Sequence, residues 1–539
     1  MTTLLEPLRL RRPKTPPAKP QRVLHDWLLV GALVVGYAIL QSAFVYQPPL
    51  SDQLHYFVDA ATLPNITEPP HQALRIGLTI PVWLAIQLFN YSEAAYYAVP
   101  YASAVGLIVA TYWVGRLLDS RATGAIAGVL VFANPFVLAD GSQLLPDIPA
   151  AALLTGALAL LIWRWQRTAN PDRLTRDDRL ALIGIGMLLG WSYLVREFIV
   201  LWFPVVVLVA WMLQLPRSWW RLVAAGAAAM FVFELLWGLV WFGNPLARIL
   251  AALNQPESQP WRVVERDELI AAGEIPDTHL EMLTAMPTNL VASDVGWILA
   301  ALALVLVVGA VLLRSPQLRV LALWVVVPVV LMLTVIQVAW LFDNRILRAE
   351  KLRYWLPVVP PLVIGGVATL MVLGRRVWGA RGAVVAAVAA GVLALASVAM
   401  TGAELDQRPG FTRTGQAEYL EFREWAATSG QTCDVIWVDA DHWRSSSRWV
   451  PMYLRTFWGR PVWDGEVKHL NVGDEWTEVE DLGTGALVRS RASLERRKLE
   501  EQELPFYLDD PPSSWRAVLR TDRDRVRVMA VGPSTCARP

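Results

Sequence analysis

Long apolar stretches recur along the chain from residue 27 to residue 401. A helix needs about 20 apolar residues to cross the hydrocarbon core of a membrane. Runs of this kind predict eleven membrane-spanning helices, so we expect a polytopic α-helical membrane protein. The predicted spans are 27–46, 94–115, 122–139, 148–165, 180–195, 198–215, 222–242, 296–313, 319–341, 355–373 and 382–401. The shorter run 76–89 predicts a re-entrant or juxtamembrane helix.

Basic residues alternate with these stretches in a way that predicts the topology. If the tail 1–26 is cytoplasmic, every loop on the cytoplasmic side is basic, as the positive-inside rule requires. These loops hold Arg116 and Arg121; Arg164, Arg167, Arg173, Arg176 and Arg179; Arg217 and Arg221; Arg314 and Arg319; and Arg375, Arg376 and Arg381. We read the first span as a retained signal anchor. Eleven spans then place the C-terminal region outside the cytoplasm.

Three longer segments are extracytoplasmic under this topology: 47–93 and 243–295, which interrupt the membrane core 27–401, and 402–539, which follows it. The last segment is charged and Trp-rich, with strand-like alternation at 434–438 and 525–529. It predicts a C-terminal extracytoplasmic α/β domain. Cys433 and Cys536 both lie there, and either a disulfide in an oxidising compartment or two unpaired thiols fits the sequence.

Composition agrees with a membrane protein, since 55% of the 539 residues are hydrophobic. The net charge of +1 gives no reason to expect a nucleic-acid partner. Two cysteines are too few for a zinc site built on closely spaced ligands. We predict no metal site, and leave open whether a divalent metal takes part.

Two carboxylates stand at the predicted extracytoplasmic ends of spans. Asp52 follows the first span, and Asp147 lies in a Leu-Pro-Asp-Ile-Pro segment before a later one. A carboxylate is costly in lipid and useful when it faces a water-filled cavity, where it can act as a general base. The alternative for each, taken alone, is a polar residue at the interface.

One loop breaks the charge pattern. The outer segment 343–354 carries Arg345, Arg348, Lys351 and Arg353, followed by Tyr354. Arginine suits bidentate contact with phosphate, so the loop predicts a phosphate site for a lipid-linked donor. The alternative is a solvated loop with local ion pairs to Asp343 and Glu350.

Weaker candidates lie in the first outer segment. His71 and Arg75 precede the short helix 76–89, and His55 and Tyr56 follow Asp52 closely. These four side chains are candidates for contact with the acceptor or the donor. A polar cap beside the membrane explains His71 and Arg75 equally well.

Two further motifs favour structural interpretations. Arg196 and Glu197 are adjacent between two spans, and we favour a structural ion pair over a pair that lines a cavity. The run Asp439-Ala440-Asp441 is similar to a metal-binding Asp-x-Asp, but it follows a strand-like run, so a solvated turn is the better interpretation. The sequon at 65–67 is a weak signal for glycosylation.

Taken in order, these features resemble the GT-C glycosyltransferases. The likeness rests on the Asp after the first span, the short helix that an Arg begins, the Leu-Pro-Asp-Ile-Pro segment, and Arg-Tyr-Trp-Leu-Pro-Val-Val-Pro-Pro at 353–361. It covers roughly 27–401. The resembled branch is the glycosyltransferase family 39-type, which holds the protein O-mannosyltransferases and the lipid A aminoarabinose transferase.

The resemblance implies a polyprenyl-phosphate-linked sugar as donor, transfer on the outer face, and inversion of the anomeric centre. It implies that Asp52 is the general base and Asp147 a second acid that shapes the site. It also implies that Arg345, Arg348 and Arg353 contact the donor phosphate. Many members have Asp-Glu where this chain has Asp52-Gln53, so we expect no metal at that position.

We therefore predict a hexosyl- or pentosyltransferase of the bacterial cytoplasmic membrane that needs no cofactor. It would move a sugar to a hydroxyl of a glycan, lipid or protein. The main alternative is a transporter or lipid flippase, which predicts internal repeats with charges near mid-membrane. We find no repeat, and the charges stand at span ends. An assembly protein is a third possibility, against which the presence of Asp52, Asp147 and Arg353 argues.

Overall fold

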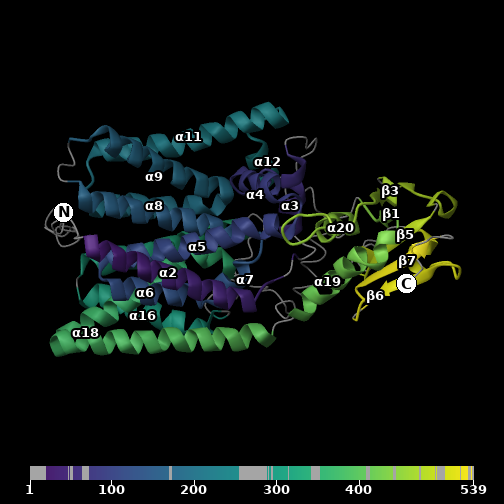
Figure 1. The fold of residues 1–539 in the computed structure, drawn as a ribbon. Coiled ribbons are helices and arrows are strands. Elements are labelled where there is room, and N and C mark those ends of the chain that lie inside the picture. The colour runs from purple at the N-terminus through teal and green to yellow at the C-terminus, as the bar shows by residue number, and fades with distance from the viewer. Residues whose placement is uncertain are drawn as a thin grey trace.

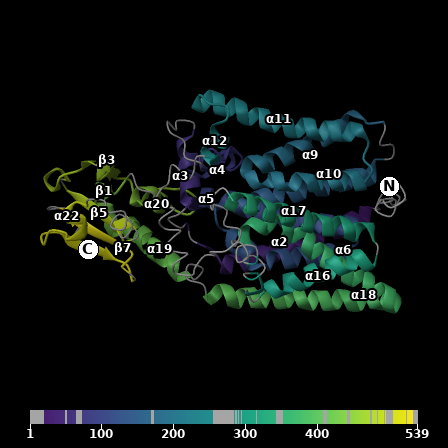
Figure 2. The same ribbon diagram turned by 180° about the vertical axis from the view of Figure 1, so that it is seen from behind.

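The computed structural model describes residues 20–46, 48, 52–63, 72–168, 173–253, 284, 288, 290–292, 295–313, 315–341, 352–407, 413–440, 445–472, 475–482, 484–491, 493–494, 504–522, 524–531 and 536. A bundle of long helices and a smaller domain with a β-sheet lie end to end (Figure 1). Helix α2 begins at the end of the bundle away from the sheet (Figures 1 and 2). We call the opposite end, where the bundle meets the C-terminal domain, the domain end.

Each of the eleven predicted spans falls on helix. The bundle helices are α2 (Pro20–Ala43), α5 (Glu93–Leu118), α6 (Arg121–Phe132), α8 (Asp147–Arg167), α9 (Arg176–Val195), α10 (Phe203–Met212), α11 (Arg217–Phe242), α16 (Gly296–Leu312), α17 (Pro316–Leu341) and α18 (Val359–Gln407). Within the described ranges, six helices are long and apolar enough to cross a membrane. The chain is a multi-pass membrane protein.

Two predicted spans are broken by local chemistry. The run 122–139 divides into α6 and the short α7 (Pro135–Asp140). Asn134 caps α7 by accepting from the backbone N–H of Phe136 at 2.9 Å, and Pro135 occupies the first helical position, where its missing N–H costs nothing. The run 198–215 begins as a 3-10 helix, η2 (Glu197–Trp202), before α10. Helix α18 bends at Trp378 and Gly379, which separates the last two predicted spans.

Short elements gather at the domain end. They are α3 (Asp52–Thr62), α4 (Ile76–Phe89), α12 (Ala247–Leu253) and the 3-10 helix η3 (Leu352–Val358). The predicted helix 76–89 is confirmed with the same bounds, and α3, α4 and α12 lie together beside the ends of the spans (Figure 1).

Glycine allows a close contact between α9 and α11. A Cβ on Gly186 of α9 would lie 2.0 Å from the carbonyl oxygen of Val223, and one on Gly226 of α11 would lie 2.1 Å from that of Ile183. Small residues that let backbones approach in this way are typical of helix pairs in membranes. The contact holds α11 against α9, whose last residue directly precedes Arg196.

Ion pairs join the helices at the other end of the bundle. Asp26 of α2 is buried and pairs with Arg116 at 3.3 Å and with Arg121. Arg375 of α18 pairs with Asp119. The basic residues that define the predicted cytoplasmic loops thus also fasten α2, α5, α6 and α18 to one another.

The C-terminal domain is built on a mixed five-stranded sheet in the order β2-β1-β5-β7-β6. The strands are β1 (Val435–Val438), β2 (Glu466–His469), β5 (Gly485–Ser490), β6 (Arg516–Arg520) and β7 (Val526–Val531). Strands β2 and β5 pair with β1 in parallel, and the β5–β7 and β7–β6 pairs are antiparallel. A small ribbon joins β3 (Asn471–Val472) to β4 (Glu475–Trp476). The remaining elements are α19 (Arg413–Ala427), η4 (Ser429–Thr432), α20 (Ser446–Tyr453), η5 (Val479–Leu482) and α22 (Phe506–Asp509).

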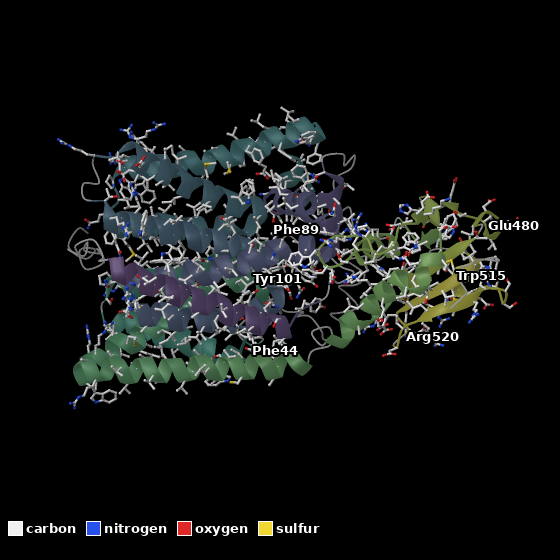
Figure 3. All side chains as sticks on the ribbon, in the orientation of Figure 1. Phe44, Phe89, Tyr101, Glu480, Trp515 and Arg520 are labelled. Atoms are coloured by element: carbon white, nitrogen blue, oxygen red, sulfur yellow. A yellow bond between two sulfur atoms is a disulfide. The ribbon has the colours of Figure 1, made fainter. Side chains whose placement is uncertain are left out.

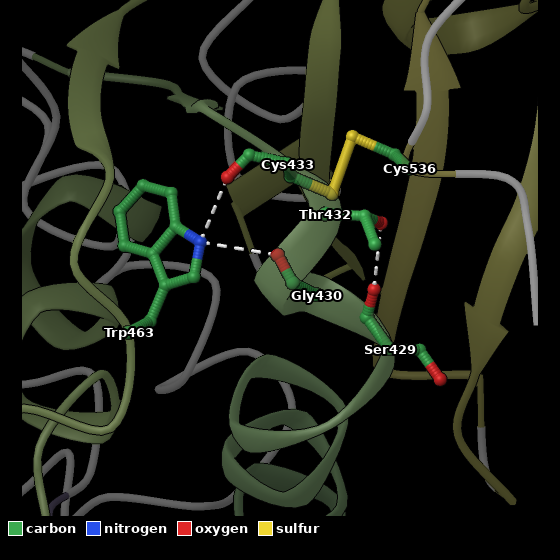
Figure 4. Close-up of a disulfide and its surroundings, with 6 residues drawn as sticks. All are labelled: Ser429, Gly430, Thr432, Cys433, Trp463 and Cys536. Atoms are coloured by element: carbon green, nitrogen blue, oxygen red, sulfur yellow. Dashed lines mark hydrogen bonds between the residues drawn. A yellow bond between two sulfur atoms is a disulfide. The ribbon is translucent and has the colours of Figure 1, made fainter.

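A disulfide joins Cys433, just before β1, to Cys536, beyond β7 (Figure 4). This settles the choice that the sequence left open. The indole N–H of Trp463 donates to the carbonyl oxygens of Gly430 at 3.1 Å and Cys433 at 3.0 Å beside it. The aromatic ring thus covers the turn that presents Cys433.

The domain is fastened to the bundle by specific contacts. Arg423 of α19 forms an ion pair with the buried Glu93 at the start of α5. The hydroxyl of Tyr91 donates to the carbonyl oxygen of Arg448 at 2.7 Å. Figure 3 places Phe89 and Tyr101 on the bundle. It places Glu480 and Trp515 in the part of the domain that lies away from the bundle.

Candidate active site

Asp147 and Arg196 form the centre of a polar cluster at the domain end. Asp147 is the first residue of α8, where the positive end of the helix dipole favours a carboxylate. Arg196 directly follows α9, and its Nε lies 3.4 Å from Oδ1 of Asp147. Both side chains are buried. The second oxygen of Asp147, Oδ2, accepts no hydrogen bond from the described part of the chain.

A pocket opens beside this ion pair. Its wall combines Asp147, Arg196 and Tyr354 with apolar side chains. The apolar lining consists of Ala150, Phe198, Ile199, Trp202 and Pro357. The guanidinium carbon of Arg196 lies 4.8 Å from the ring centroid of Tyr354 and 5.1 Å from that of Phe198, within cation–π range. The pocket therefore combines a fixed cation with apolar surface.

Arg353 adds a second cation to the same carboxylate. It neighbours Tyr354 in η3, with its guanidinium carbon 5.3 Å from the Tyr354 ring centroid, and it faces the charges of Asp147 and Asp140. Its Nε is buried and has no hydrogen-bond partner among the described residues. Two positive charges around the single charge of Asp147, together with the unpaired donor Nε of Arg353, favour an anionic ligand at this place.

A second group of charges lies next to the first. Arg75, just before α4, reaches Glu197 with two nitrogens, Nε to Oε1 at 3.1 Å and Nη2 to Oε2 at 3.3 Å. It also donates to the hydroxyl of Tyr56. Burial raises the pKa of Tyr56 to about 12, although the positive charge of Arg75 opposes the rise. Arg196 and Glu197 thus form ion pairs with different elements and link the two groups.

Arg248 of α12 supports this second group from behind. It is buried, its Nε lies 2.7 Å from Oε1 of Glu234 in α11, and it donates to the carbonyl oxygens of Leu194 at 2.8 Å and Tyr193 at 3.2 Å. These bonds hold the end of α9 that leads into Arg196. Neither Arg248 nor Glu234 was among the residues predicted from the sequence, although a charge such as Glu234 within the apolar run 222–242 is itself a signal for function.

Asp52 opens α3 at the edge of this cluster. It is half-buried, and its charge acts on Tyr56, which lies one turn further along the same helix. The next residue, Gln53, donates to Oε1 of Gln143 at 2.7 Å, in the loop that leads to Asp147. The structure therefore brings the helix of Asp52 and the start of α8 together.

The other face of α3 meets the C-terminal domain. Arg448 of α20 donates from Nη1 to Nδ1 of His55 at 2.9 Å. Asp59 lies one turn further along α3, and the positive charge of Arg448 acts on its carboxyl group as well. His55 thus contacts the domain, whereas Tyr56 contacts Arg75.

Four of the predicted site residues fall outside the described residues. These are His71, Arg345, Arg348 and Lys351. Of the predicted site residues in the basic loop, the structure therefore describes Arg353 and Tyr354. Tyr354 lines the pocket, and Arg353 precedes it in η3 with its charge acting on Asp147. Within the described ranges, no three His, Cys, Asp or Glu side chains gather as a metal site would need.

The solvated-turn interpretation of the Asp439 motif was wrong for its first member. Asp439 is buried, and its Oδ1 accepts from the backbone N–H of Ser446 at 2.7 Å, while Ser493 donates to its Oδ2. It ties the end of β1 to the start of α20. Asp441 lies outside the described residues.

The architecture is the GT-C fold, as the sequence predicted. The crystal structure of ArnT from Cupriavidus metallidurans bound to undecaprenyl phosphate matches 97% of this chain and 100% of that chain, with a TM-score of 0.56 and 14% identity. The apo structure of the same protein matches 96% and 100%, with a TM-score of 0.55 and 13% identity. At such identities the likeness establishes the fold.

A more distant match is the Archaeoglobus fulgidus oligosaccharyltransferase AglB, in complex with an inhibitory peptide and a dolichol-phosphate. It has a TM-score of 0.45 and 15% identity over 74% of this chain and 58% of that chain. No protein-family model and no curated protein matches the sequence.

Proposed function

We propose that this protein transfers a hexosyl or pentosyl group from a polyprenyl-phosphate-linked donor to an acceptor hydroxyl at the outer face of a bacterial cytoplasmic membrane. The acceptor is a glycan, a lipid or a protein. The observation that carries the proposal is the placement of Arg196 and Arg353 around Asp147, beside the helix that Asp52 begins. Arg75 lies in the adjoining group, where it pairs with Glu197. The ArnT structure with undecaprenyl phosphate supports the choice of lipid.

In the proposed reaction, Asp52 removes the proton from the acceptor hydroxyl. The acceptor oxygen bonds to the anomeric carbon while the bond from that carbon to the phosphate oxygen breaks. The polyprenyl phosphate leaves with the bonding electrons, and attack opposite the leaving group inverts the anomeric centre. Arg196 and Arg353 stabilise the phosphate charge, which grows as the bond breaks.

The remaining contacts hold these groups in place. The apolar wall of the pocket, with Phe198, Ile199 and Trp202, accepts the first part of the lipid chain next to the phosphate. Glu197 and Arg248 fix the segment around Arg196. A site held by several buried ion pairs loses little conformational freedom when the donor binds, which favours catalysis by positioned charges.

Two observations support an extracytoplasmic site. The Cys433–Cys536 disulfide suits an oxidising compartment, and the domain that carries it meets the bundle at the same end as Asp52 and Asp147. The basic residues around Asp26 lie at the other end, where the positive-inside rule puts the cytoplasm.

Asp52→Asn tests the proposal directly. A general base contributes about 10²- to 10⁴-fold, so transfer from undecaprenyl-phosphate sugars in proteoliposomes should fall by that factor. The affinity for the donor should stay at the wild-type value, because the carboxylate acts on the acceptor. Arg353→Gln should differ by lowering donor affinity as well as transfer, with affinity reduced about tenfold for each 1.4 kcal/mol of lost phosphate contact.

Asp177→Asn is the matched control, since Asp177 is exposed at the first turn of α9, at the other end of the bundle. It should transfer sugar as the wild type does. Wild-type transfer by Asp52→Asn would refute the proposed role of Asp52. If undecaprenyl-phosphate sugars cross the membrane unchanged and none is consumed, the protein is instead a transporter or flippase.

A further inference from the structure

An exposed hairpin of the C-terminal domain lies against the bundle and has no part in the proposed chemistry. It runs from Arg455 to Val462, with a bridge between Arg455 and Pro461 and a backbone bond from Thr456 N–H to the carbonyl oxygen of Arg460 at 2.7 Å. Gly459 at its tip has a φ of 89°, which favours glycine. A Cβ there would also lie 2.0 Å from the carbonyl oxygen of Phe89. The tip is therefore shaped to approach the bundle.

Backbone and ring contacts fix the hairpin tip at the start of α5. The carbonyl oxygen of Phe457 accepts from the N–H of Ala94 at 2.9 Å. The Phe457 ring stacks parallel to that of Tyr97, with centroids 6.3 Å apart, and the Trp458 ring lies 6.1 Å from that of Phe89. The tip is thus level with the first turn of a membrane-spanning helix.

The length of α5 gives the depth of that turn. It has 26 residues, and a rise of about 1.5 Å per residue makes a helix of this length about 39 Å long. The hydrocarbon core is about 30 Å thick. The ends of α5 therefore extend beyond the core into the headgroup region, and the hairpin tip lies at that level.

The tip presents the side chains that a headgroup region accepts. Trp458 is 66% exposed, although it is large and apolar. Leu88 on the neighbouring end of α4 is 75% exposed. Arg460 is exposed and Arg455 partly so, next to this apolar surface. Aromatic rings flanked by arginines are typical of the membrane–water interface, where the ring lies among the headgroups and the cation meets phosphate.

We propose that the Arg455–Val462 hairpin inserts its tip into the headgroup region of the bilayer, so that Trp458 anchors the C-terminal domain to the membrane beside α4. Leu84 and Leu88 of α4 and Trp458 of the domain are all exposed, so the same lipid would cover apolar side chains of both parts. The proposal does not depend on the transferase activity, because it concerns the lipid around the protein.

The experiment measures the depth of a spin label in proteoliposomes. Both native cysteines are in the disulfide, so a single added cysteine can be labelled selectively. Trp458→Cys carries the label at the tip. Leu88→Cys is the positive control, and Phe506→Cys on α22, where Phe506 is 63% exposed, is the control in water. Each label is exposed to oxygen, which partitions into lipid, and to a water-soluble nickel complex.

We expect the Trp458→Cys label to lose nickel accessibility and gain oxygen accessibility relative to Phe506→Cys, as the Leu88→Cys label does. Nickel accessibility equal to that of Phe506→Cys would refute the proposal. Dipolar broadening between labels on two molecules would show that a second copy covers the tip, and would refute it as well. Circular dichroism of each labelled variant confirms that the fold is kept.

Discussion

Asp59 of α3 is a buried carboxyl group at the domain end that the sequence did not predict as a site residue. Its Oδ2 has no hydrogen-bond partner within the described ranges. Burial raises the pKa of Asp59 to about 7, although Arg448 opposes the rise. Tyr91, which donates to the backbone of Arg448, and His55 are the other polar groups around that contact. The carboxyl group therefore gains a proton near neutral pH.

This shift makes stability depend on pH with a definite sign. Between pH 3.8, the usual pKa, and about 7, the folded chain holds a proton at Asp59 that the unfolded chain has lost. The free energy of unfolding therefore falls as pH rises through this range. At about 1.4 kcal/mol per pKa unit, the effect is about 4 kcal/mol at most. Asp59→Asn should remove it and stabilise the protein at pH 8.

Thermal unfolding in nanodiscs between pH 5 and 8 measures this difference. Asp524→Asn is the control, since hydrogen bonds from Arg527 lower the pKa of Asp524 and its titration lies below the range tested. It should leave the slope of stability against pH unchanged. An Asp59→Asn variant with the wild-type slope would show that Asp59 is ionised throughout.

Residue by residue, the sequence predicted charges at span ends, Arg75 among them, but it did not predict how they pair, and it missed Arg248. Asp147, Arg353 and Tyr354 were predicted, and the structure places them together. Arg248 was missed because its partners, Glu234 and Glu197, come from other elements. A pattern along the chain carries no information about such pairings, since they arise only when the helices pack.

At the scale of elements, α3 connects Asp52 with both the bundle and the C-terminal domain. Its N-terminus carries Asp52, its Tyr56 meets Arg75, and its His55 meets Arg448 of the domain. The length of the apolar runs predicted the spans well, and it predicted the bounds of α4. It did not predict α3, because 11 residues with a low mean apolarity give no signal of a span.

Arg448→Gln should loosen α3. The substitution removes the cation that faces His55 and Asp59, and a hydrogen bond to a charged group contributes about 1.5 to 3 kcal/mol. A loss of 1 to 2 kcal/mol corresponds to about a 5- to 30-fold change in a local opening equilibrium. We expect the amides of residues 52–62 to exchange hydrogen faster by about this factor, and transfer to fall because Asp52 begins that helix.

Arg520→Gln is the matched control, because Arg520 lies on the sheet and pairs with Asp524 at the surface (Figure 3). It should leave the exchange of α3 unchanged. If Arg448→Gln also leaves it unchanged, α3 is held by the bundle alone, and the domain has no part in placing Asp52.

At the scale of the whole molecule, the sequence predicted a membrane core followed by an α/β domain, and the structure has both. It did not predict how they join. The contacts between Arg423 and Glu93 and between Phe457 and Ala94 link residues more than 300 positions apart. Composition changes along the chain reveal that a second part exists, but the fit between two surfaces is visible only in the folded structure.

Removing the disulfide tests whether the C-terminal domain and the bundle unfold independently. The disulfide links residues 103 positions apart and encloses the whole sheet, while the bundle lies outside the loop. Removing a link of this kind gives the unfolded domain more conformational freedom and typically lowers the free energy of unfolding by about 2 to 5 kcal/mol. The double variant Cys433→Ala/Cys536→Ala should therefore lower the free energy of unfolding of the domain by that amount.

Alanine leaves no polar group at these two buried sites, so the decrease in the free energy of unfolding measures the contribution of the disulfide itself. Limited proteolysis on heating, with fragments assigned by mass, separates cleavage in 413–531 from cleavage in the bundle. The double variant should lose the domain at a lower temperature, and the wild type treated with reductant should behave in the same way. Since the domain fastens α3 through Arg448, the amides of α3 should also exchange hydrogen faster in the double variant, whereas those of α9 and α11 should not. A bundle that melts together with the domain would show that the two parts form one cooperative unit.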